Sequence, residues 1–359
     1  MPIHKYFVAD LVSNLKNHNF QRILLSRLRF MGDVILTTPV VRRLREAYPA
    51  AEIVYLTEAA FAPLLAHNPH VDEVIAFSPQ QSHAQQIRLY RHLRRRRFDL
   101  VLDLFGNPRT ALMTWLTGAR VRIGGDFRGR GKLYNFRVPP PNVEMSAIDF
   151  HLRSLQLLGL ATTSKYTEIF LTPDERLWAQ SFLFMQNIDP AKPVVALHPG
   201  ATWPNKRWPE KYFAEVSNHL QKSGVQVVVT QGPAETGIVQ ELQRLSPAAT
   251  ILPVLSLRET AAIQHQCKAV VANDCGIMHL AVAVGTPTIG LFGPSQKEIW
   301  FPYEITKGHL ALDIPIDCRP CHKNYCPLQH TDCQNLLPPF RVIDEVMQRL
   351  SKQAPGTIV

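Results

Sequence analysis

The chain has 359 residues, of which 46% are hydrophobic and 19% are charged. This composition is typical of a folded globular protein and excludes a disordered chain or a coiled coil. Because domains usually contain roughly 100 to 200 residues, the length predicts two of them. The formal net charge of +10 predicts an acidic partner, which is a nucleic acid, an anionic membrane or a phosphorylated substrate.

The sequence shows no signal for export or membrane insertion. No apolar run approaches the roughly 18 to 20 residues that span a bilayer, and the segment 1–20 has no signal-peptide cleavage pattern. We therefore expect a cytoplasmic protein. In that compartment the six cysteines are expected to be reduced thiols or metal ligands, because disulfides are rare there.

In chain order, apolar runs rich in β-branched residues alternate with helical patterns in both halves, which predicts parallel sheets. The expected helices include 38–48, with Pro39 in its first turn, and 208–224, which begins near Pro209 and ends at Gly224. The predicted strands are 22–28, 51–57, 72–77, 99–105 and 120–125 in the first half, and 193–200, 225–232, 268–276 and 286–294 in the second.

The predicted fold class is α/β, with two Rossmann-like domains that face each other across a cleft. Turn residues around 161–193 place the boundary there, with one amphipathic stretch at 175–185. Ligands of such sheets bind at the carboxyl ends of the strands, so function is expected in the cleft. The expected parts are an N-terminal domain at 1–165, a linker at 166–190, a C-terminal domain at 191–340, and a final helix and tail at 341–359.

Much of the positive charge lies in two segments of the first half, 87–98 (IRLYRHLRRRRF) and 119–132 (ARVRIGGDFRGRGK). Each is compatible with a solvated helix face or loop, and equally with docking to an anionic surface. Neither has an interleaved aromatic platform for stacking on bases, and the chain has no zinc-finger spacing or RNP-like signature. We therefore expect no nucleic-acid partner.

The first segment that indicates chemistry is 22–49, a predicted strand, a short glycine turn and a helix that begins around Leu36 to Pro39. Gly32 and Asp33 are expected in the turn, which would place the Asp33 carboxylate at the mouth of the sheet as a general base for a substrate hydroxyl. The alternative is that Asp33 only caps the following helix. Neither GxGxxG nor GxxxxGK[ST] occurs, which disfavours a dinucleotide-dependent dehydrogenase, a kinase and an ATPase.

Two segments of the second half have the pattern of an anion site. The loop in 194–213 carries Gly200, Thr202 and Lys206 ahead of a helix that starts at Pro209, and a lysine there suits a diphosphate; the alternative is surface charge. In 270–294, the residues at 274–276 precede an apolar helix predicted at 277–284, whose N–H groups suit phosphate oxygens.

Three side chains at the start of that helix have more than one interpretation. Asp274 either binds a hydroxyl or caps the helix. Cys275, one residue before the helix, is a candidate for a depressed pKa, although no histidine and acid are arranged around it as a nucleophile pair. His279, alone on an apolar helix, is either a hydrogen-bonded core residue or a site residue.

Together these segments resemble the heptosyltransferase family that builds the inner core of lipopolysaccharide. The matching stretches are RFMGDVILTTP at 29–39, HPGATWPNKRWP at 198–209 and NDCGIMHLA at 273–281, in the family's order and across nearly the whole chain. The resemblance implies a GT-B fold, a donor bound mainly by the second domain, an acceptor bound by the first, and inversion at the anomeric carbon without an obligatory metal or cofactor.

The resemblance also assigns residues. Asp33 matches the family's general base, and Lys206 the group that stabilises the departing diphosphate. The donor-binding residues that it implies are Thr202, Lys206, Glu235, Asp274, Cys275, Gly276, Ile277, Met278 and His279. Glu235 falls near the acidic residue that holds the adenosine ribose, and Cys275 departs from the threonine of several family members, which puts one donor hydrogen bond in doubt. We assign Arg120, Arg122 and Arg128 to the acceptor.

The function that follows is transfer of heptose from ADP-L-glycero-D-manno-heptose to the inner core of a phosphorylated lipopolysaccharide or lipid A acceptor. The expected location is the cytoplasmic face of the inner membrane, with peripheral contact to its anionic surface. The alternatives are a GT-B transferase with another nucleotide sugar or glycan acceptor, and a non-catalytic protein that binds an anionic surface.

A cysteine cluster near the end has no assigned role in this function. Cys318, Cys321, Cys326 and Cys333 have the spacing C-x2-C-x4-C-x6-C, with His322 and His330 nearby. Four thiols this close suit a tetrahedral zinc site, but the spacing is that of neither a standard zinc finger nor a ferredoxin. Clustered free thiols are the alternative, and we assign no metal.

Overall fold

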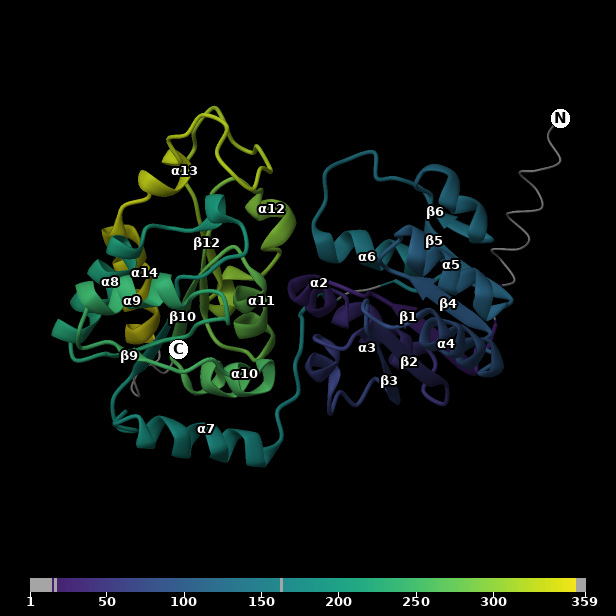
Figure 1. Cartoon of the computed structure of the whole chain (residues 1–359), viewed down its shortest axis with the longest axis horizontal. Coiled ribbons are helices and arrows are strands. Elements are labelled where there is room, and N and C mark those ends of the chain that lie inside the picture. Colours follow the sequence, from purple (N-terminus) through teal and green to yellow (C-terminus); the bar gives the residue numbers. More distant parts are fainter. Residues whose placement is uncertain (1–14, 16–17, 162–163, 353–359) are drawn as a thin grey trace. The chain divides into compact units, whose positions relative to one another are not determined.

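The computed structural model describes residues 15, 18–161 and 164–352, and it forms two compact units that divide between Thr167 and Glu168 (Figure 1). Each unit contains one parallel sheet covered by helices on both faces. Among the described residues, no helix is both long enough and apolar enough to cross a membrane.

The sheet of the first unit has the order β3-β2-β1-β4-β5-β6, with every pair parallel. Its strand β4 is buried along its whole length and β2 is buried except at its two ends, as expected where helices cover both faces. The strands are β1 (Arg22–Ser26), β2 (Glu52–Glu58), β3 (Glu73–Phe77), β4 (Leu100–Asp103), β5 (Val121–Gly125) and β6 (Phe136–Val138).

The helices of the first unit divide between the two faces of this sheet. Leu93 of α4 and Met113 of α5 pack with Leu24 and Val54 in one core cluster, while α3 and α2 contact α6. The helical segments are α2 (Met31–Leu36), α3 (Thr38–Ala47), η1 (Ala62–Leu65), α4 (His83–Arg95), α5 (Pro108–Thr117), η2 (Arg128–Leu133) and α6 (Ala147–Gln156).

The second unit repeats this topology, with the order β12-β11-β10-β7-β8-β9 and parallel pairing throughout. Read from its own first strand, this is the same order as in the first unit, and it is the Rossmann order. The strands are β7 (Val194–His198), β8 (Gln226–Val229), β9 (Thr250–Ile251), β10 (Ala269–Asn273), β11 (Thr288–Leu291) and β12 (Leu310–Leu312).

The core of the second unit lies between its sheet and three helices. Phe213 of α8, Leu242 of α9 and Val346 of α14 pack with Val227 and Ile289, and Figure 1 shows α11 on the opposite face of the sheet. The helical segments are α7 (Pro173–Met185), η3 (Pro204–Lys206), α8 (Glu210–Lys222), α9 (Thr236–Leu245), α10 (Leu257–Gln266), α11 (Gly276–Ala283), α12 (Lys297–Trp300), η4 (Ile305–Lys307), α13 (Asp332–Asn335) and α14 (Pro339–Lys352).

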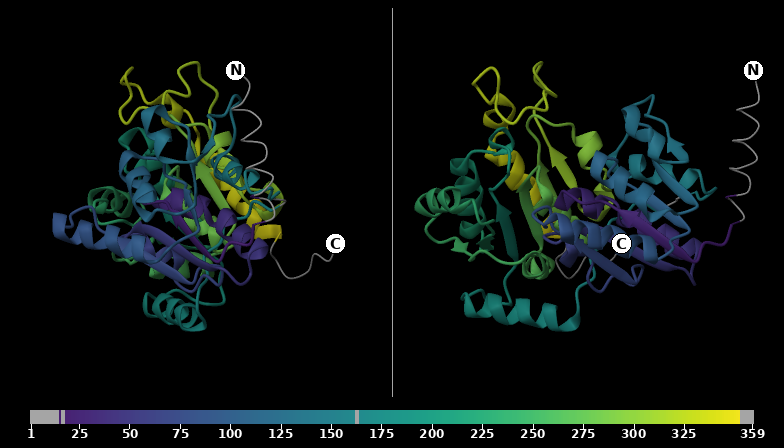
Figure 2. Two further views of the ribbon diagram at one scale, coloured as in Figure 1. Left: turned by 90° about the vertical axis from the view of Figure 1, so that its right-hand side faces the viewer. Right: turned by 45° about the vertical axis from the view of Figure 1, so that its right-hand side comes forward.

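The segment expected to be the linker, 166–190, contains helix α7. This helix lies beside α10 in Figure 1 and in the right-hand view of Figure 2. Arg258 of α10 fixes it, because the guanidinium lies 2.5 Å from the Glu175 carboxylate. Glu175 in turn accepts a hydrogen bond from the Thr172 backbone in a capping box at the start of α7.

One local prediction was wrong. Gly32 and Asp33 were expected in a turn before a helix that begins near Leu36, but they are the second and third residues of the separate short helix α2. Residues Arg27 to Phe30 connect the end of β1 to the start of this helix. Thr37 then interrupts the helical run, and α3 begins at Thr38 with Pro39 in its first turn.

Candidate functional site

Polar residues, among them several that the sequence singled out, lie at the carboxyl ends of the two sheets. In the first unit, Ser26 and Asp103 end neighbouring strands in register, and Asp33 follows a few residues after Ser26. In the second unit, His198 ends β7 and Asn273 ends β10, with Lys206 and Asp274 just beyond them. Parallel sheets bind ligands at this edge.

Asp33 is held by two contacts within the first unit. One carboxylate oxygen lies 2.5 Å from Nη2 of Arg27, and both side chains are less than 15% exposed. The other oxygen accepts a hydrogen bond from the backbone N–H of Phe30 at 3.1 Å. The carboxylate therefore caps the N-terminus of α2, which is the alternative that the sequence left open, and a role for Asp33 in the site stays a prediction.

A second carboxylate at the same edge is absent from the predicted site. Asp103 is 4% exposed and accepts hydrogen bonds from Tyr134 Oη at 2.6 Å, Ser26 Oγ at 3.2 Å and the Gly106 N–H at 2.9 Å. Burial, followed by the charge and hydrogen bond of Asp103, raises the pKa of Tyr134 well above its usual range, so the phenol stays protonated. The available signal was an aspartate at the end of a buried strand.

Lys206 and Asp274 form an ion pair in the second unit. The Lys206 ammonium lies 2.7 Å from the Asp274 carboxylate, and the two side chains are 19% and 4% exposed. Ser295 also hydrogen bonds to this carboxylate, and the ammonium lies over the Trp203 ring at 4.9 Å. Lys206 is therefore held in a cluster of side chains beside α11. It is not the isolated surface charge that the sequence left as an alternative.

The N-terminus of α11 directly follows this ion pair. Gly276, Ile277 and Met278 form its first turn, and within the described part of the chain its N-cap residue makes no side-chain capping hydrogen bond. A helix N-terminus with a lysine beside it has the fixed partial and full positive charges that a diphosphate requires. The cap residue is Cys275, and burial raises its pKa to about 12, outweighing the N–H groups of Met278 and Ile277. The sequence hypothesis of a depressed pKa at Cys275 is therefore corrected.

His279 lies one turn further along α11 and is 4% exposed. Its Nδ1 is 2.7 Å from the hydroxyl of Tyr303, and the two rings meet edge to face. This geometry is that of the hydrogen-bonded core histidine that the sequence left as one alternative. A contact of His279 with a donor stays a prediction.

Glu235 lies against the loop that follows β7. It accepts a hydrogen bond from Gly232 N at 2.6 Å, and its carboxylate lies 3.6 Å from Nε2 of the buried His198. A Cβ at Gly200 would overlap this carboxylate, so the close approach requires glycine there. Thr202 is exposed in the same loop. Glu235 and the phosphate-site candidates are thus placed around one sheet edge.

The structure does not bring Arg120 and Arg122 to the edge that holds Asp33. Both lie at the start of β5, whose residue Gly124 pairs with Asp103 at the opposite end. The Arg122 guanidinium donates to the carbonyl oxygens of Ala119 at 2.6 Å and Leu133 at 3.1 Å. The backbone of Arg128 begins η2, and its side chain lies outside the described part of the structure. Contact of these arginines with an acceptor stays a prediction.

The cysteine cluster lies in the loop before α13 and at the start of that helix. Within residues 18–161 and 164–352, no three histidine, cysteine or acidic side chains are arranged to hold a metal ion. Cys333 is buried, and burial raises its pKa to about 11. Backbone N–H groups, chiefly that of Thr331, lower the pKa of Cys326.

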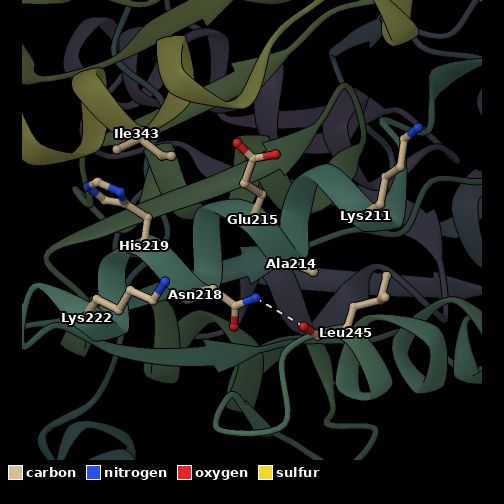
Figure 3. A pocket seen from close by; sticks show the side chains of 8 residues that line it. All are labelled: Lys211, Ala214, Glu215, Asn218, His219, Lys222, Leu245 and Ile343. Carbon is tan, nitrogen blue, oxygen red and sulfur yellow. Dashed lines mark hydrogen bonds between the residues drawn. The ribbon is translucent and has the colours of Figure 1, made fainter.

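Two openings on the helical layers lie away from these residues. One of about 430 Å³ runs along α8 between Leu245 and Ile343, and its lining side chains Lys211, Glu215 and His219 point from the helix surface (Figure 3). The Asn218 side chain closes part of it through a hydrogen bond to the Leu245 carbonyl. A second opening, of about 600 Å³, lies between α4 and α5 in the first unit.

Comparison with known proteins agrees with this geometry. The model of Glycosyltransferase family 9 (heptosyltransferase) matches residues 86–332, which is more than half of the chain. The chain is 29% identical over 326 residues to lipopolysaccharide heptosyltransferase 1 of Pseudomonas aeruginosa, covering 87% of this chain and 89% of that protein. It is 26% identical over 289 residues to lipopolysaccharide heptosyltransferase 3 of Escherichia coli, covering 77% and 84%.

Solved structures show the same fold. The glycosyl transferase family 9 protein of Veillonella parvula aligns with a TM-score of 0.84 and 24% identity, over 94% of this chain and 99% of that one. The ADP-heptose lipopolysaccharide heptosyltransferase II of E. coli aligns with a TM-score of 0.78 and 22% identity, over 93% and 99%. The two six-stranded parallel sheets are those of the GT-B fold, as predicted.

Proposed function

The chain belongs to glycosyltransferase family 9, and on that premise we propose that it transfers heptose from ADP-L-glycero-D-manno-heptose to the inner core of lipopolysaccharide. The observation that supports this most is the ion pair between Lys206 and Asp274 beside the uncapped N-terminus of α11. One of the structural neighbours is an E. coli heptosyltransferase with ADP-2-deoxy-2-fluoro heptose, aligned at a TM-score of 0.67 and 22% identity.

In the proposed reaction, the second unit binds the donor. The N–H groups of Gly276 to Met278 receive the phosphate oxygens, and Lys206 stabilises the negative charge that grows on the departing ADP. Asp274 holds the ammonium in place. Glu235 binds a hydroxyl of the adenosine ribose, and Thr202 adds a hydroxyl to the same loop.

Asp33 is the proposed general base. Its carboxylate takes the proton of the acceptor hydroxyl as the oxygen attacks C1 of the heptose, with inversion and without a covalent intermediate. Arg27, at 2.5 Å, keeps this carboxylate in one orientation. No side chain needs to change its role during the step, because the base and the diphosphate-stabilising groups are separate.

We also propose peripheral contact with an anionic membrane through the opening between α4 and α5. Trp115 is 51% exposed and Ile87 48% exposed there, and Arg91 and Arg95 rim the same opening. An exposed tryptophan flanked by arginines suits the interface of an anionic bilayer. The acceptor lipid would then be reached from the membrane surface.

The decisive experiment is product formation, followed by mass spectrometry, from ADP-heptose and truncated lipopolysaccharide core acceptors. We expect one added heptose on one of these acceptors. UDP- and GDP-sugars run in parallel distinguish the alternative donors, and thermal stabilisation of the protein by each nucleotide sugar reports binding without turnover. Transfer from a UDP- or GDP-sugar alone would overturn the assignment of the donor, and binding without any product would favour a non-catalytic protein.

A further inference from the structure

A small cavity in the first unit lies where β4 and β5 end and α6 passes over them. Its volume is about 30 Å³, and its wall includes Asp103, Phe127, Phe150 and His151. One water needs roughly 10 to 15 Å³ of such space. The cavity therefore admits a group of about two non-hydrogen atoms, which is the size of a hydroxymethyl arm.

His151 lines the cavity and also has a buried polar atom without a partner in the described part of the chain. The residue is 4% exposed, and its Nδ1 is buried without a hydrogen-bond partner among the residues that the structure describes. Burial, and after it the positive charge of Arg27, lower the pKa of His151 well below its usual value, so the ring is neutral. A buried ring nitrogen without a partner is costly, and a bound group that supplies the hydrogen bond removes that cost.

The remaining walls are apolar and closely fitted. The rings of Phe127 and Phe150 are stacked, with centroids 6.2 Å apart and planes 24° apart. Phe127 can lie this close to the sheet because residue 125 is glycine. Any other residue there would have a Cβ that overlaps the Phe127 ring. These rings offer an apolar surface to the carbon skeleton of a bound group.

The charges around the cavity favour an uncharged ligand group. Asp103 is buried in the wall, and Tyr134, Ser26 and backbone N–H groups already donate to its carboxylate. An anionic group would lie beside this carboxylate and a neutral imidazole, and the positive charge of the nearby Arg27 is already paired with Asp33. A hydroxyl fits either tautomer of His151, because it can both donate and accept a hydrogen bond.

The cavity lies next to Arg27, the residue that pairs with the candidate base Asp33. Nη1 of Arg27 donates to the carbonyl of Leu104 at 2.9 Å, and its guanidinium lies over the Phe105 ring at 4.8 Å. Leu104 and Phe105 both line the cavity, and the same guanidinium pairs with Asp33. A group held in the cavity is thus one arginine away from the proposed base.

We infer that this cavity recognises a neutral, hydroxyl-bearing arm of the acceptor sugar, with Nδ1 of His151 as the hydrogen-bond partner. The inference rests on the proposed function, because it takes the first unit to bind the acceptor. It makes His151 a specificity-determining residue, since an acceptor without the hydroxyl leaves Nδ1 unpaired.

The first test compares acceptor kinetics of two His151 variants. His151→Phe is expected to raise the KM for the truncated core acceptor about tenfold, the effect of one lost hydrogen bond, with the KM for ADP-heptose unchanged. His151→Asn, which keeps a polar atom near the position of Nδ1, is expected to restore most of the acceptor affinity. His309→Phe is the matched control, because His309 is 5% exposed with an unpartnered Nδ1 but lies in the second unit.

A second variant and a binding measurement keep the inference testable if His151→Phe does not fold. Ser154 lines the cavity from the next turn of α6, so Ser154→Met fills it with His151 intact and is expected to weaken the acceptor similarly. In the unaltered protein, the imidazole 15N signals of His151 are expected to shift when the core oligosaccharide is added without donor.

The outcomes separate this inference from the proposed function. Transfer with unchanged acceptor KM in His151→Phe and in Ser154→Met overturns the inference alone. A shift of the His151 signals with the oligosaccharide, but no transfer from ADP-heptose, overturns the proposed function and supports the cavity. No shift at saturating oligosaccharide overturns the inference.

Discussion

Nη2 of Arg27 lies 2.5 Å from a carboxylate oxygen of Asp33, and the two side chains are only 13% and 14% exposed to solvent. The carboxylate at the start of α2 therefore has one fixed charged neighbour, provided by its own unit. Because the carboxylate is already oriented, little conformational entropy is lost when it accepts a proton in the reaction. The consequence can be measured at Asp33 itself.

Replacing this carboxylate should separate catalysis from donor binding. Asp33→Asn is expected to lower kcat by about 100- to 10,000-fold, the usual contribution of a general base, while the Kd for ADP-heptose stays the same. Steady-state kinetics and calorimetry measure the two quantities. Asp72→Asn is the matched control, because Asp72 also pairs with an arginine at 2.5 Å but precedes β3, at the amino end of the sheet. Turnover of Asp33→Asn at the wild-type rate would remove Asp33 from the mechanism.

The ion pair of the second unit predicts effects on both stability and affinity. Lys206→Ala leaves the 4% exposed Asp274 carboxylate without its ammonium partner, so we expect a loss of unfolding free energy of about 2 kcal/mol together with weaker ADP-heptose binding. The double variant Lys206→Met, Asp274→Asn is expected to recover the stability without the affinity. Denaturant titration and calorimetry check the two effects.

Lys297→Ala is the control for this prediction, since it breaks a Lys–Asp contact of 2.6 Å with Asp313, a residue outside the proposed donor site. We expect it to keep the donor affinity. Full donor affinity in Lys206→Ala would place the lysine in a structural role only, and the proposed stabilisation of the departing diphosphate would then lack its charged group.

The sequence predicted the long buried strands well and the short ones poorly. Strands β1 and β10 each contain a continuous apolar run, Ile23 to Leu25 and Ala269 to Ala272, which indicates a strand covered on both faces. Strands β6, β9 and β12 have three residues or fewer and lie at or next to the sheet edges. Their pairing depends on the neighbouring strand, and no pattern of three residues specifies it.

The site was predictable only where consecutive residues form it. Lys206 and Asp274 were both selected because each precedes a helix, but their 2.7 Å contact joins residues far apart in sequence. Asp103 and Tyr134 were missed for the same reason, since their hydrogen bond spans 31 residues. The run 94–97 looked uniform in sequence, yet Arg96 pairs with Glu52 and Glu73 while Arg95 stays exposed.

The cysteines should differ sharply in their rates of alkylation, because the thiolate is the reactive form. Burial raises the pKa of Cys275 and of Cys267 to about 12, whereas backbone N–H groups lower the pKa of the partly exposed Cys326. With iodoacetamide at pH 8, we expect Cys326 to be labelled first and the other two to stay unlabelled in the folded protein. Peptide mass spectrometry over time measures this order, and early labelling of Cys275 would contradict its raised pKa.

The structure divides the arginines at 91–97, at the end of α4, into exposed and ion-paired ones, and this division allows a specific test of membrane contact. Arg91 and Arg95 are exposed beside Trp115, whereas the Arg96 guanidinium lies 2.5 Å from Glu73 and 2.7 Å from Glu52. Each arginine near an anionic surface contributes about 1 kcal/mol, and the attraction fades beyond roughly 8 Å at physiological salt. Arg91, Arg94 and Arg95 are exposed and line the opening with the tryptophan, so they are in a position to contribute, whereas Arg96 is not.

The double variant Arg91→Gln, Arg95→Gln is therefore expected to weaken binding to liposomes of anionic phospholipid by about 10- to 30-fold at low salt. Trp115→Ala is expected to weaken this binding at all salt concentrations, because burial of the tryptophan ring in the bilayer does not depend on charge. Arg96→Gln is the matched control: it removes the same charge from the same helix but from an arginine already neutralised, so liposome binding should hardly change while stability falls. Cosedimentation across a salt series measures all three. Equal losses for Arg96→Gln and the exposed pair would show that net charge alone governs the attraction, and unchanged binding of every variant would leave the opening between α4 and α5 without a role at the membrane.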